Sequence, residues 1–217
     1  MGKGKYFILC KFDLVFIFAS FERQRMTFDE IKAHLRGKTV GIAGCGGLGS
    51  NCAVALARVG VGTLVLADYD VIIMSNLNRQ YFFLDQVGML KTEALEINIG
   101  RINPDVKVIL HNVMLTPENI PAIFKDCDVI IEGFDLADQK QMLIETVLSV
   151  FQEKYLVLGL GMAGWGLSNE LMVRASDKMY ICGDGVSEIS SDHPPLAPRV
   201  GIVANQQANV ALEILLK

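Results

Sequence analysis

The 217-residue sequence predicts an α/β fold in which helices cover both faces of a doubly wound, mostly parallel sheet. Short apolar runs alternate with helical segments along most of the chain. Several of these runs are continuously apolar, which is typical of parallel strands buried on both faces. A glycine-rich turn, Gly44–Gly49, follows the first such run and precedes a helical segment. These three observations together predict the fold class.

The elements are expected in the following order. A capping box, Thr27 to Glu30, opens the first helix, and Gly37 suits its end. Apolar or alternating runs predict strands at residues 40–43, 63–67, 106–111, 129–132, 156–160, 170–174 and 179–182. Helical segments are expected at residues 51–59, 91–102, 137–151 and 200–216. Another helix is expected to open at Thr116-Pro117-Glu118, and residues 183–198 are expected to form a polar loop.

The composition excludes several classes of protein. Apolar residues make up 51% of the chain and the net charge is −4, which excludes a disordered chain. An acidic balance argues against a nucleic-acid partner. The five cysteines include no Cys-x-x-Cys pair, so the pattern indicates reduced thiols, a cytoplasmic location and no zinc site.

Residues 1–25 form an apolar N-terminal extension, and residues 26–217 are expected to form one domain. Lys11 and Asp13 interrupt the apolar run, whereas a membrane span needs about 20 consecutive apolar residues. A membrane anchor or secretory signal is therefore disfavoured. The extension is expected to be either an arm that packs on the body or on a partner, or a segment upstream of a start at Met26.

The glycine-rich turn has the pattern Gly44-x-Gly46-x-x-Gly49 in the strand-to-helix context that makes this motif informative. Gly44 permits the tight turn, Gly46 lets backbone amides approach phosphates, and Gly49 lets helix and strand pack closely. The helix N-terminus adds unpaired N–H groups. The motif predicts nucleotide binding on a Rossmann-like sheet.

Asp68 ends the second strand, nineteen residues after Gly49. A carboxylate there is placed to bind ribose hydroxyls. Taken alone, this signature favours NAD as the ligand.

The segment that follows favours a polyphosphate instead. Residues 75–80 are rich in groups that bind anions, and Arg79 and Lys91 are placed to flank a triphosphate from two directions. Asp135 follows a buried strand at the same carboxyl edge of the sheet, where its carboxylate can hold Mg²⁺.

These motifs resemble the ThiF/MoeB adenylyltransferase family, the bacterial relatives of ubiquitin-activating enzymes, over residues 38–217. The resemblance rests on the segments 44–50, 68–70 and 75–80 together with Lys91 and Asp135. Residues 161–164, 180–185 and 197–205 look most like the short ThiF proteins of thiamine biosynthesis.

The resemblance implies adenylation of the C-terminal Gly-Gly carboxylate of a small ThiS-like ubiquitin-fold sulfur carrier, with ATP and Mg²⁺ as cosubstrate and cofactor and pyrophosphate as product. It implies catalytic roles for Arg79, Lys91 and Asp135, with Asp135 as the Mg²⁺ ligand and Gln80 as a support of the phosphate loop. The implied nucleotide-binding residues are Gly44, Gly46, Gly47, Gly49, Asp68, Asn76, Arg79, Gln80 and Lys91.

The resemblance also implies a homodimer in which an N-terminal arginine enters the neighbouring site, with Arg23 and Arg25 as candidates. Cys182 is the candidate for a sulfur-transfer thiol, although a buried inert thiol is the favoured interpretation.

Four alternatives stay open. Within the family, the substrate is a carrier of the molybdopterin pathway or the enzyme is a tRNA-modifying dehydratase. Outside it, the protein is an NAD(P)-dependent oxidoreductase or a non-catalytic module that binds ubiquitin-like proteins. The oxidoreductase is disfavoured because it gives Arg79 and Lys91 no task and because the sequence shows no acid or base for hydride chemistry. The presence of Arg79, Lys91 and Asp135 argues against a module that has lost catalysis.

Overall fold

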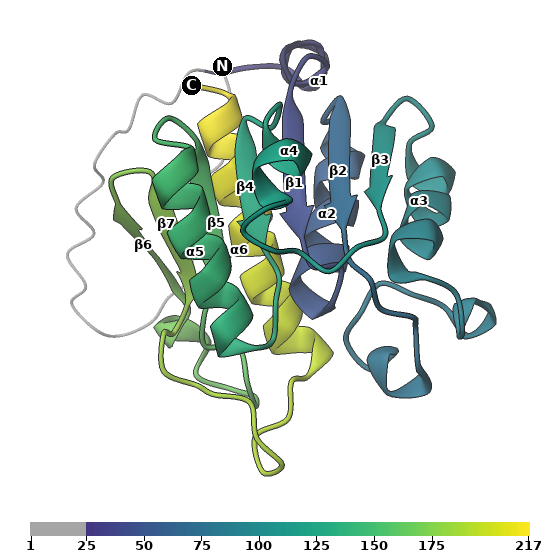
Figure 1. The fold of residues 1–217 in the computed structure, drawn as a ribbon, viewed down its shortest axis with the longest axis vertical. Helices are drawn as coiled ribbons and strands as arrows, with labels where there is room; N and C mark the ends of the chain where they lie inside the picture. The colour runs from purple at the N-terminus through teal and green to yellow at the C-terminus, as the bar shows by residue number, and fades with distance from the viewer. Residues whose placement is uncertain (1–24) are drawn as a thin grey trace, which may run out of the picture.

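A computed structural model describes residues 25–217 and contains one seven-stranded sheet in the order β3-β2-β1-β4-β5-β7-β6 (Figure 1). Every neighbouring pair is parallel except β6 and β7, which are antiparallel. The predicted doubly wound, mostly parallel α/β fold is therefore confirmed. The apolar extension up to residue 24, including Arg23, lies outside the described residues.

The observed elements follow the predicted order. The strands are β1 (Thr39–Ala43), β2 (Thr63–Ala67), β3 (Lys107–His111), β4 (Val129–Glu132), β5 (Tyr155–Gly159), β6 (Met172–Ser176) and β7 (Met179–Gly183). The helices are α1 (Phe28–Leu35), α2 (Gly47–Val59), α3 (Lys91–Ile102), α4 (Ile120–Phe124), α5 (Ala137–Val150) and α6 (Ala197–Leu215). Short 3₁₀ turns lie at η1 (Met74–Asn76), η2 (Leu84–Gln86) and η3 (Ser168–Glu170).

Three expected helix starts were wrong. The helix expected from residue 51 already begins at Gly47, as α2. The chain at Thr116 forms a turn, and α4 begins only at Ile120. The Asn119 side chain accepts a hydrogen bond from the Thr116 amide (2.9 Å) and donates one to the Met114 carbonyl (2.9 Å), which offers the backbone an alternative to the helix. Conversely, α6 begins at Ala197 rather than Val200, because Pro198 is well tolerated in a first helical turn.

The helices form two layers, one on each face of the sheet. Helices α1, α2, α3 and α6 pack on one face, and α4 and α5 pack on the other, so that α5 lies in front of the sheet and α6 behind it in Figure 1. Both faces of the central strands are thus covered, which explains their continuous apolar sequences. None of the described helices is long and apolar enough to cross a membrane.

The direction of winding reverses between β1 and β4. The chain proceeds from β1 outward to β2 and β3, and from β4 outward to β5, while β1 and β4 are neighbours. In open α/β sheets, the crevice beyond the carboxyl ends of two such strands is where ligands bind. The register pairs Ala43 of β1 with Ala67 of β2 and with Glu132 of β4, so three strands end side by side.

Candidate functional site

A cavity of about 380 Å³ opens at this reversal point, beyond the carboxyl ends of β1, β2 and β4. The predicted site residues that line it are Gly44, Gly46, Gly47, Asp68, Arg79, Gln80, Lys91 and Asp135. Gly49, Asn76 and Cys182 are predicted site residues that do not line it. The fold therefore brings together eight predicted positions that span more than ninety residues of sequence.

The glycine turn has little room for side chains. Gly44 has a φ of +90°, a left-handed conformation that glycine adopts readily. A Cβ on Gly49 would lie 1.9 Å from the Gly44 carbonyl oxygen and 2.9 Å from Cγ2 of Ile42. Only hydrogen fits at residue 49, so this glycine acts by allowing α2 to approach β1.

The N-terminus of α2 forms part of the cavity wall, because Gly46, Gly47 and Leu48 line the cavity. Gly46 is the N-cap, and no side chain caps the amides that follow it. A helix start with unpaired N–H groups favours an anionic ligand. Ser50 and Asn51 attach the neighbouring segment to this helix: Ser50 Oγ accepts from the Tyr81 amide (3.0 Å), and Asn51 Nδ2 donates to the Arg79 carbonyl (2.9 Å).

Asp68 is held at the end of β2 by backbone amides. Its Oδ2 accepts a hydrogen bond from the Cys45 amide (2.6 Å), and its Oδ1 accepts one from the Asp70 amide (2.8 Å). Burial raises the pKa of this carboxyl above its ordinary value, while the nearby charge of Lys91 and the two amides oppose that rise. The carboxylate is thereby fixed in orientation at one end of the cavity.

The two predicted phosphate-binding cations differ in their partners. Arg79 Nη1 donates to the neutral oxygens of Ser75 (carbonyl, 3.2 Å) and Asn78 (Oδ1, 2.8 Å), and no carboxylate pairs with Arg79 among the described residues. Lys91 is buried and its Nζ lies 2.6 Å from Oδ2 of Asp70, which is half exposed. Arg79 therefore carries the less compensated charge.

Gln80 and Asn76 lie on the same segment but have different surroundings. Gln80 is buried in the cavity wall, and its Oε1 has no hydrogen-bond partner among the described residues. That oxygen is available to accept a hydrogen bond from a bound molecule. Asn76 turns inward: its Oδ1 accepts from the Ile73 amide (3.0 Å), so the side chain shapes the η1 turn.

Asp135 is an exposed carboxylate on the cavity wall, three residues after β4. The described residues contain no cluster of three or more His, Cys, Asp or Glu side chains that could bind a metal unaided. This donor set fits Mg²⁺ that arrives with a polyphosphate, because Mg²⁺ usually binds through one or two carboxylates, phosphate oxygens and water.

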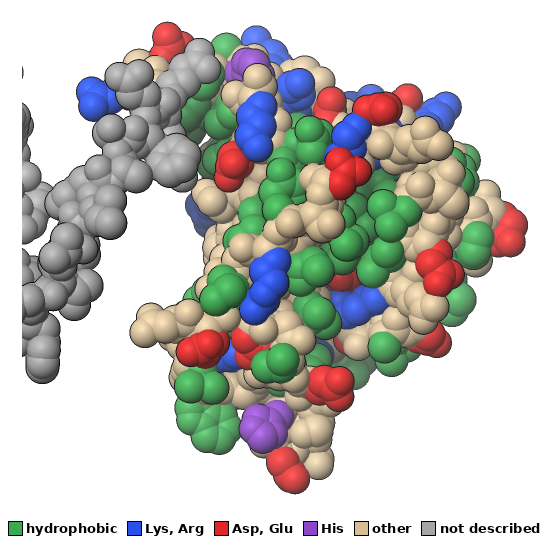
Figure 2. Space-filling view, turned by 90° about the vertical axis from the view of Figure 1, so that its left-hand side faces the viewer, with side chains coloured by type: hydrophobic (Ala, Val, Ile, Leu, Met, Phe, Trp, Pro, Cys, Tyr) green, Lys and Arg blue, Asp and Glu red, His purple; other side chains and the backbone are tan. Residues whose placement is uncertain are grey.

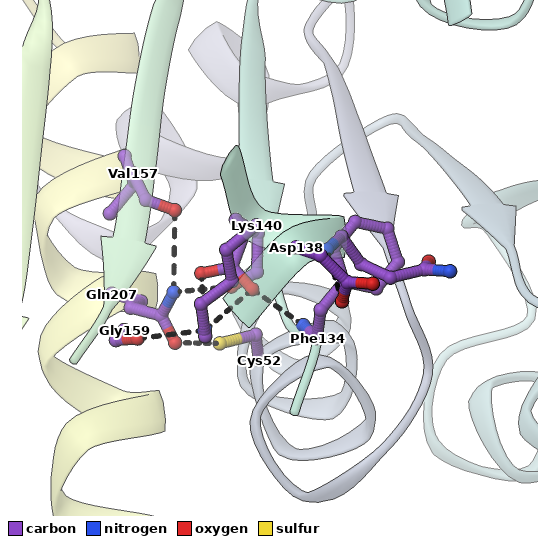
Figure 3. Close-up of polar contacts among 9 residues, drawn as sticks. Cys52, Phe134, Asp138, Lys140, Val157, Gly159 and Gln207 are labelled. Atoms are coloured by element: carbon purple, nitrogen blue, oxygen red, sulfur yellow. Dashed lines mark hydrogen bonds and ion pairs between the residues drawn. The ribbon is translucent and has the colours of Figure 1, made fainter. Parts of the chain in front are cut away.

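A buried ion pair lies beneath this wall. Glu132, the last residue of β4, is 1% exposed, and both of its carboxylate oxygens accept hydrogen bonds from Lys140 Nζ (2.7 and 2.8 Å). Figure 3 shows Lys140, Phe134, Gly159 and Gln207 meeting around the end of β4. Burial raises the pKa of Glu132, and the charge of Lys140 opposes that rise.

Cys182 lies in the core, outside the cavity lining. Its side chain is fully buried in β7 among the residues that pack against α2 and α6. Burial raises its pKa to about 12. A thiol in this environment is protonated at neutral pH and is not a nucleophile.

Sequence reasoning missed part of the cavity wall. The missed residues are Leu48, Ala67, Tyr69, Asp70, Val113, Leu115, Gly133, Phe134, Leu136, Gln139, Lys140, Met162, Ile189, Pro195 and Val200. One signal was present for Lys140: the run Val-Ile-Ile-Glu132 places a carboxylate in a buried strand, which requires a cationic partner. The apolar wall from Met162, Ile189 and Pro195 has no such signal.

The fold and this cavity define a class: doubly wound α/β proteins with a glycine turn and a ligand crevice at the reversal point. Within that class, the chain belongs to the ThiF family, whose profile matches residues 21–217.

The proteins similar to this chain fall into two groups, proteins similar in sequence and solved structures similar in fold. The chain is 44% identical to "Ubiquitin-like modifier-activating enzyme 5" of Drosophila willistoni over 93 residues, which is 43% of this chain and 23% of that protein. The Drosophila melanogaster counterpart is 36% identical over 132 residues, 60% of this chain and 32% of that protein. The chain thus spans less than a third of the length of these relatives.

The second group consists of solved structures with the same fold. The E. coli tRNA N6-threonylcarbamoyladenosine dehydratase TcdA in complex with ATP superposes with a TM-score of 0.78 at 20% identity, covering 87% of this chain and 89% of that chain. E. coli MccB with ATP gives a TM-score of 0.65 at 22% identity, covering 85% of this chain and 58% of that chain. At these identities, the likeness establishes the fold.

Proposed function

We propose that this protein is an ATP-dependent adenylyltransferase that activates the C-terminal Gly-Gly carboxylate of a small ubiquitin-fold carrier. The observation that carries the proposal is one cavity that combines a fixed carboxylate (Asp68), an uncapped helix N-terminus, two cations (Arg79 and Lys91) and a second carboxylate (Asp135). Membership of the ThiF family and the similarity to ubiquitin-like modifier-activating enzyme 5 support the same chemistry.

The proposed nucleotide lies along the cavity from Asp68 toward Asp135. The Asp68 carboxylate accepts hydrogen bonds from the ribose hydroxyls, and the wall around Ala67, Val113 and Leu115 receives the base. The phosphates lie over the amides of Gly46 and Gly47, with Arg79 and Lys91 as counter-ions. Asn76 then acts indirectly, by shaping the turn that carries Arg79.

Asp135 would hold Mg²⁺ together with phosphate oxygens. The ion would neutralise charge that develops on the departing pyrophosphate. An ion pair with Asp70 orients Lys91, and hydrogen bonds to two neutral oxygens orient Arg79. Both cations are therefore positioned before a ligand binds. Such preorganisation avoids rearrangement during the reaction.

The reaction requires no general base. An oxygen of the carrier's terminal carboxylate attacks the α-phosphorus of ATP, forming a C–O–P linkage. The bond between the α-phosphorus and the bridging oxygen of the pyrophosphate breaks, and pyrophosphate leaves with that electron pair. The nucleophile is already an anion, so in-line positioning and charge stabilisation account for the rate enhancement.

The carrier's tail has an apolar route into the cavity. Met162, Ile189 and Pro195 add apolar side chains to the cavity lining. Hydrophobic side chains also gather on the face that carries α5 and β6 (Figure 2), where Leu148, Met172 and Val173 are each between 43% and 52% exposed. An exposed apolar face of this kind suits a protein substrate.

We further propose a ThiS-like sulfur carrier of thiamine thiazole synthesis as the substrate, a cytoplasmic location and a homodimer. The basis is the match of residues 161–164, 180–185 and 197–205 to short ThiF proteins. Cys182 has no part in this proposal, because its buried thiol does not reach the cavity lining.

The test is ATP–pyrophosphate exchange with and without a ThiS-like protein. Exchange that requires the carrier, and that disappears when the carrier's Gly-Gly terminus is removed, is expected. Exchange with a molybdopterin-type carrier alone would redirect the substrate assignment. The absence of exchange with every Gly-Gly carrier, together with measurable NADH binding, would overturn the proposal in favour of an oxidoreductase.

A further inference from the structure

We propose that Lys140 is a positioning residue of the adenylation site: it neutralises Glu132 and thereby fixes the Gly133–Asp135 turn against the glycine turn. The inference rests on the proposed function in one respect, the assignment of Asp135 as the Mg²⁺ ligand. Lys140 lines the cavity, so the alternative role is direct contact with phosphate. The surroundings of its ammonium group favour the positioning role.

The ammonium group of Lys140 is already saturated. Its three N–H donors match three acceptors, the two carboxylate oxygens of Glu132 (2.7 and 2.8 Å) and the Gly159 carbonyl (3.0 Å). Its charge is balanced by a carboxylate that is 1% exposed. Arg79, in contrast, donates only to neutral oxygens. A phosphate would therefore bind Arg79 without displacing a carboxylate, whereas at Lys140 it would have to displace Glu132.

Glu132 transmits this pairing to the turn that follows it. Its Oε1 accepts a hydrogen bond from the Phe134 amide (2.6 Å), which fixes the backbone one residue before Asp135. The position of the carboxylate therefore determines the path of the chain into Asp135. Without a cation, a carboxylate buried to this degree would be protonated or would move toward water.

The Gly133–Asp135 turn is already in close contact with the glycine turn. A Cβ on Gly133 would lie 2.7 Å from the Gly44 carbonyl oxygen and 3.0 Å from the Gly49 amide nitrogen. A Cβ on Gly44 would lie 3.0 Å from the Phe134 ring. The two turns thus pack backbone against backbone, and a displacement at Glu132 changes the separation between Asp135 and the phosphate-binding amides.

Hydrogen bonds with β5 and α6 also hold the Lys140–Glu132 ion pair in place. Lys140 joins α5 to the end of β5 through Gly159, and Gln207 of α6 donates to the Glu132 carbonyl (2.8 Å) and the Val157 carbonyl (3.3 Å). The network in Figure 3 therefore connects β4, β5, α5 and α6 at one edge of the sheet. It is a scaffold for the turn that presents Asp135.

A double-mutant cycle separates positioning from phosphate contact. The variants are Lys140→Gln, Glu132→Gln and the double variant, and the readout is ATP binding by calorimetry as Mg²⁺ is titrated, without carrier. Lys140→Gln is expected to raise the half-saturating Mg²⁺ concentration about tenfold, because supporting groups of metal ligands typically contribute that much. The double variant, which leaves no buried uncompensated charge, is expected to return to within about threefold of the wild type.

Direct phosphate contact by Lys140 gives the opposite pattern. Lys140→Gln would then weaken ATP binding equally in the wild-type and Glu132→Gln backgrounds, and this result would overturn the inference. Lys140→Arg, which keeps the positive charge, is expected to keep the half-saturating Mg²⁺ concentration of the wild type. Val147→Ala is the matched control, because Val147 is buried on the same helix away from the cavity. It should lower the melting temperature and leave the Mg²⁺ midpoint unchanged.

A second measurement keeps this inference separate from the proposed function. Hydrogen exchange at the Phe134 amide is expected to accelerate in Lys140→Gln and to slow again in the double variant, whether or not any carrier supports exchange of pyrophosphate. If the wild type fails every adenylation assay while this pattern holds, the function is wrong and the positioning role stands. Unchanged exchange at Phe134 in Lys140→Gln would overturn the positioning role itself.

Discussion

At the scale of single residues, charge pairing distinguishes the three cations of the cavity. Arg79 has only neutral partners, Lys91 pairs with the half-exposed Asp70, and Lys140 pairs with the buried Glu132. A ligand anion therefore meets the least competition from carboxylates at Arg79 and the most at Lys140. We therefore assign Arg79 and Lys91 to the phosphates and Lys140 to the scaffold.

Replacement of either cation that we propose to bind phosphate is expected to slow ATP–pyrophosphate exchange. Arg79→Ala or Lys91→Ala should lose at least about tenfold in rate, roughly 1.4 kcal/mol of transition-state stabilisation. Lys107→Ala is the control, because Lys107 is an exposed cation at the amino end of β3, on the opposite edge of the sheet. Full activity in the Arg79→Ala/Lys91→Ala double variant would show that the phosphates bind elsewhere.

The buried carboxyl group of Asp68 is expected to make the stability of the folded protein depend on pH. Burial raises the pKa of its carboxyl, so its favourable contribution is complete below the ordinary pKa of about 3.9 and is lost as the pH rises through the raised value. Asp68→Asn removes this titration. The melting temperature of Asp68→Asn relative to the wild type should therefore rise across that pH window.

Thermal melts between pH 4 and pH 7 measure this difference. Val147→Ala, which removes buried apolar atoms from α5 and no titratable group, is the control: its melting temperature relative to the wild type should not change with pH. A difference between Asp68→Asn and wild type that is constant with pH would contradict the assigned burial effect. The same variant should bind ATP more weakly, because it removes the proposed ribose acceptor.

Site residues within a strong local motif could be predicted from the sequence, whereas site residues that reach the cavity only through long-range contacts could not. Gly44, Asp68, Arg79, Lys91 and Asp135 all line one cavity, because each follows a strand or loop that ends at the same edge of the sheet. Asn76 lies beside them in sequence but turns into its own loop, which a linear motif does not reveal. The wall from residues 160–200 depends on loop packing, for which the sequence carries no periodic signal.

At the scale of elements, the approach of α2 to β1 depends on Gly49. A methyl group there would overlap the Gly44 carbonyl oxygen, so Gly49→Ala must push the helix away from the turn. Overpacking of this kind typically costs about 1–3 kcal/mol, and the displaced amides should also bind ATP less tightly. Denaturant unfolding and calorimetry measure the two effects.

Gly100 provides the matched control for this substitution. It lies within α3 with no heavy atom within 4 Å of the position of an added Cβ. Gly100→Ala should therefore be neutral or stabilising by about 0.5–1 kcal/mol, because alanine favours the helix. Equal stability of the Gly49→Ala and wild-type proteins would contradict the packing role assigned to Gly49.

Element positions were predictable where periodicity and capping agreed. The capping box of α1 forms as expected, with the Thr27 amide donating to Glu30 Oε2 (2.7 Å). The predicted start of α4 was wrong because the Asn119 side chain accepts a hydrogen bond from the Thr116 amide and so stabilises a turn where a helix was expected. The short 3₁₀ turns between β2 and α3 carry no period that a pattern could detect.

At the scale of the whole molecule, the strand order makes the site. Because β1 and β4 are adjacent while their connections run to opposite sides, the glycine turn and the Gly133–Asp135 turn pack against each other, and both line one crevice. Met162 and Pro195, from loops distant in sequence, also line this crevice. The proposed function requires this one crevice to hold both a nucleotide and the end of an extended acceptor.

The proposed reaction joins a carrier carboxylate to AMP in this cavity. Intact-mass spectrometry of a ThiS-like carrier, quenched after incubation with the protein, ATP and Mg²⁺, tests this reaction. We expect a carrier species that is heavier by one adenylyl group, located on the C-terminal glycine, and that is strongly reduced with Arg79→Ala. A carrier that stays unmodified while ATP is bound, or an adenylyl group on any other residue, would contradict it.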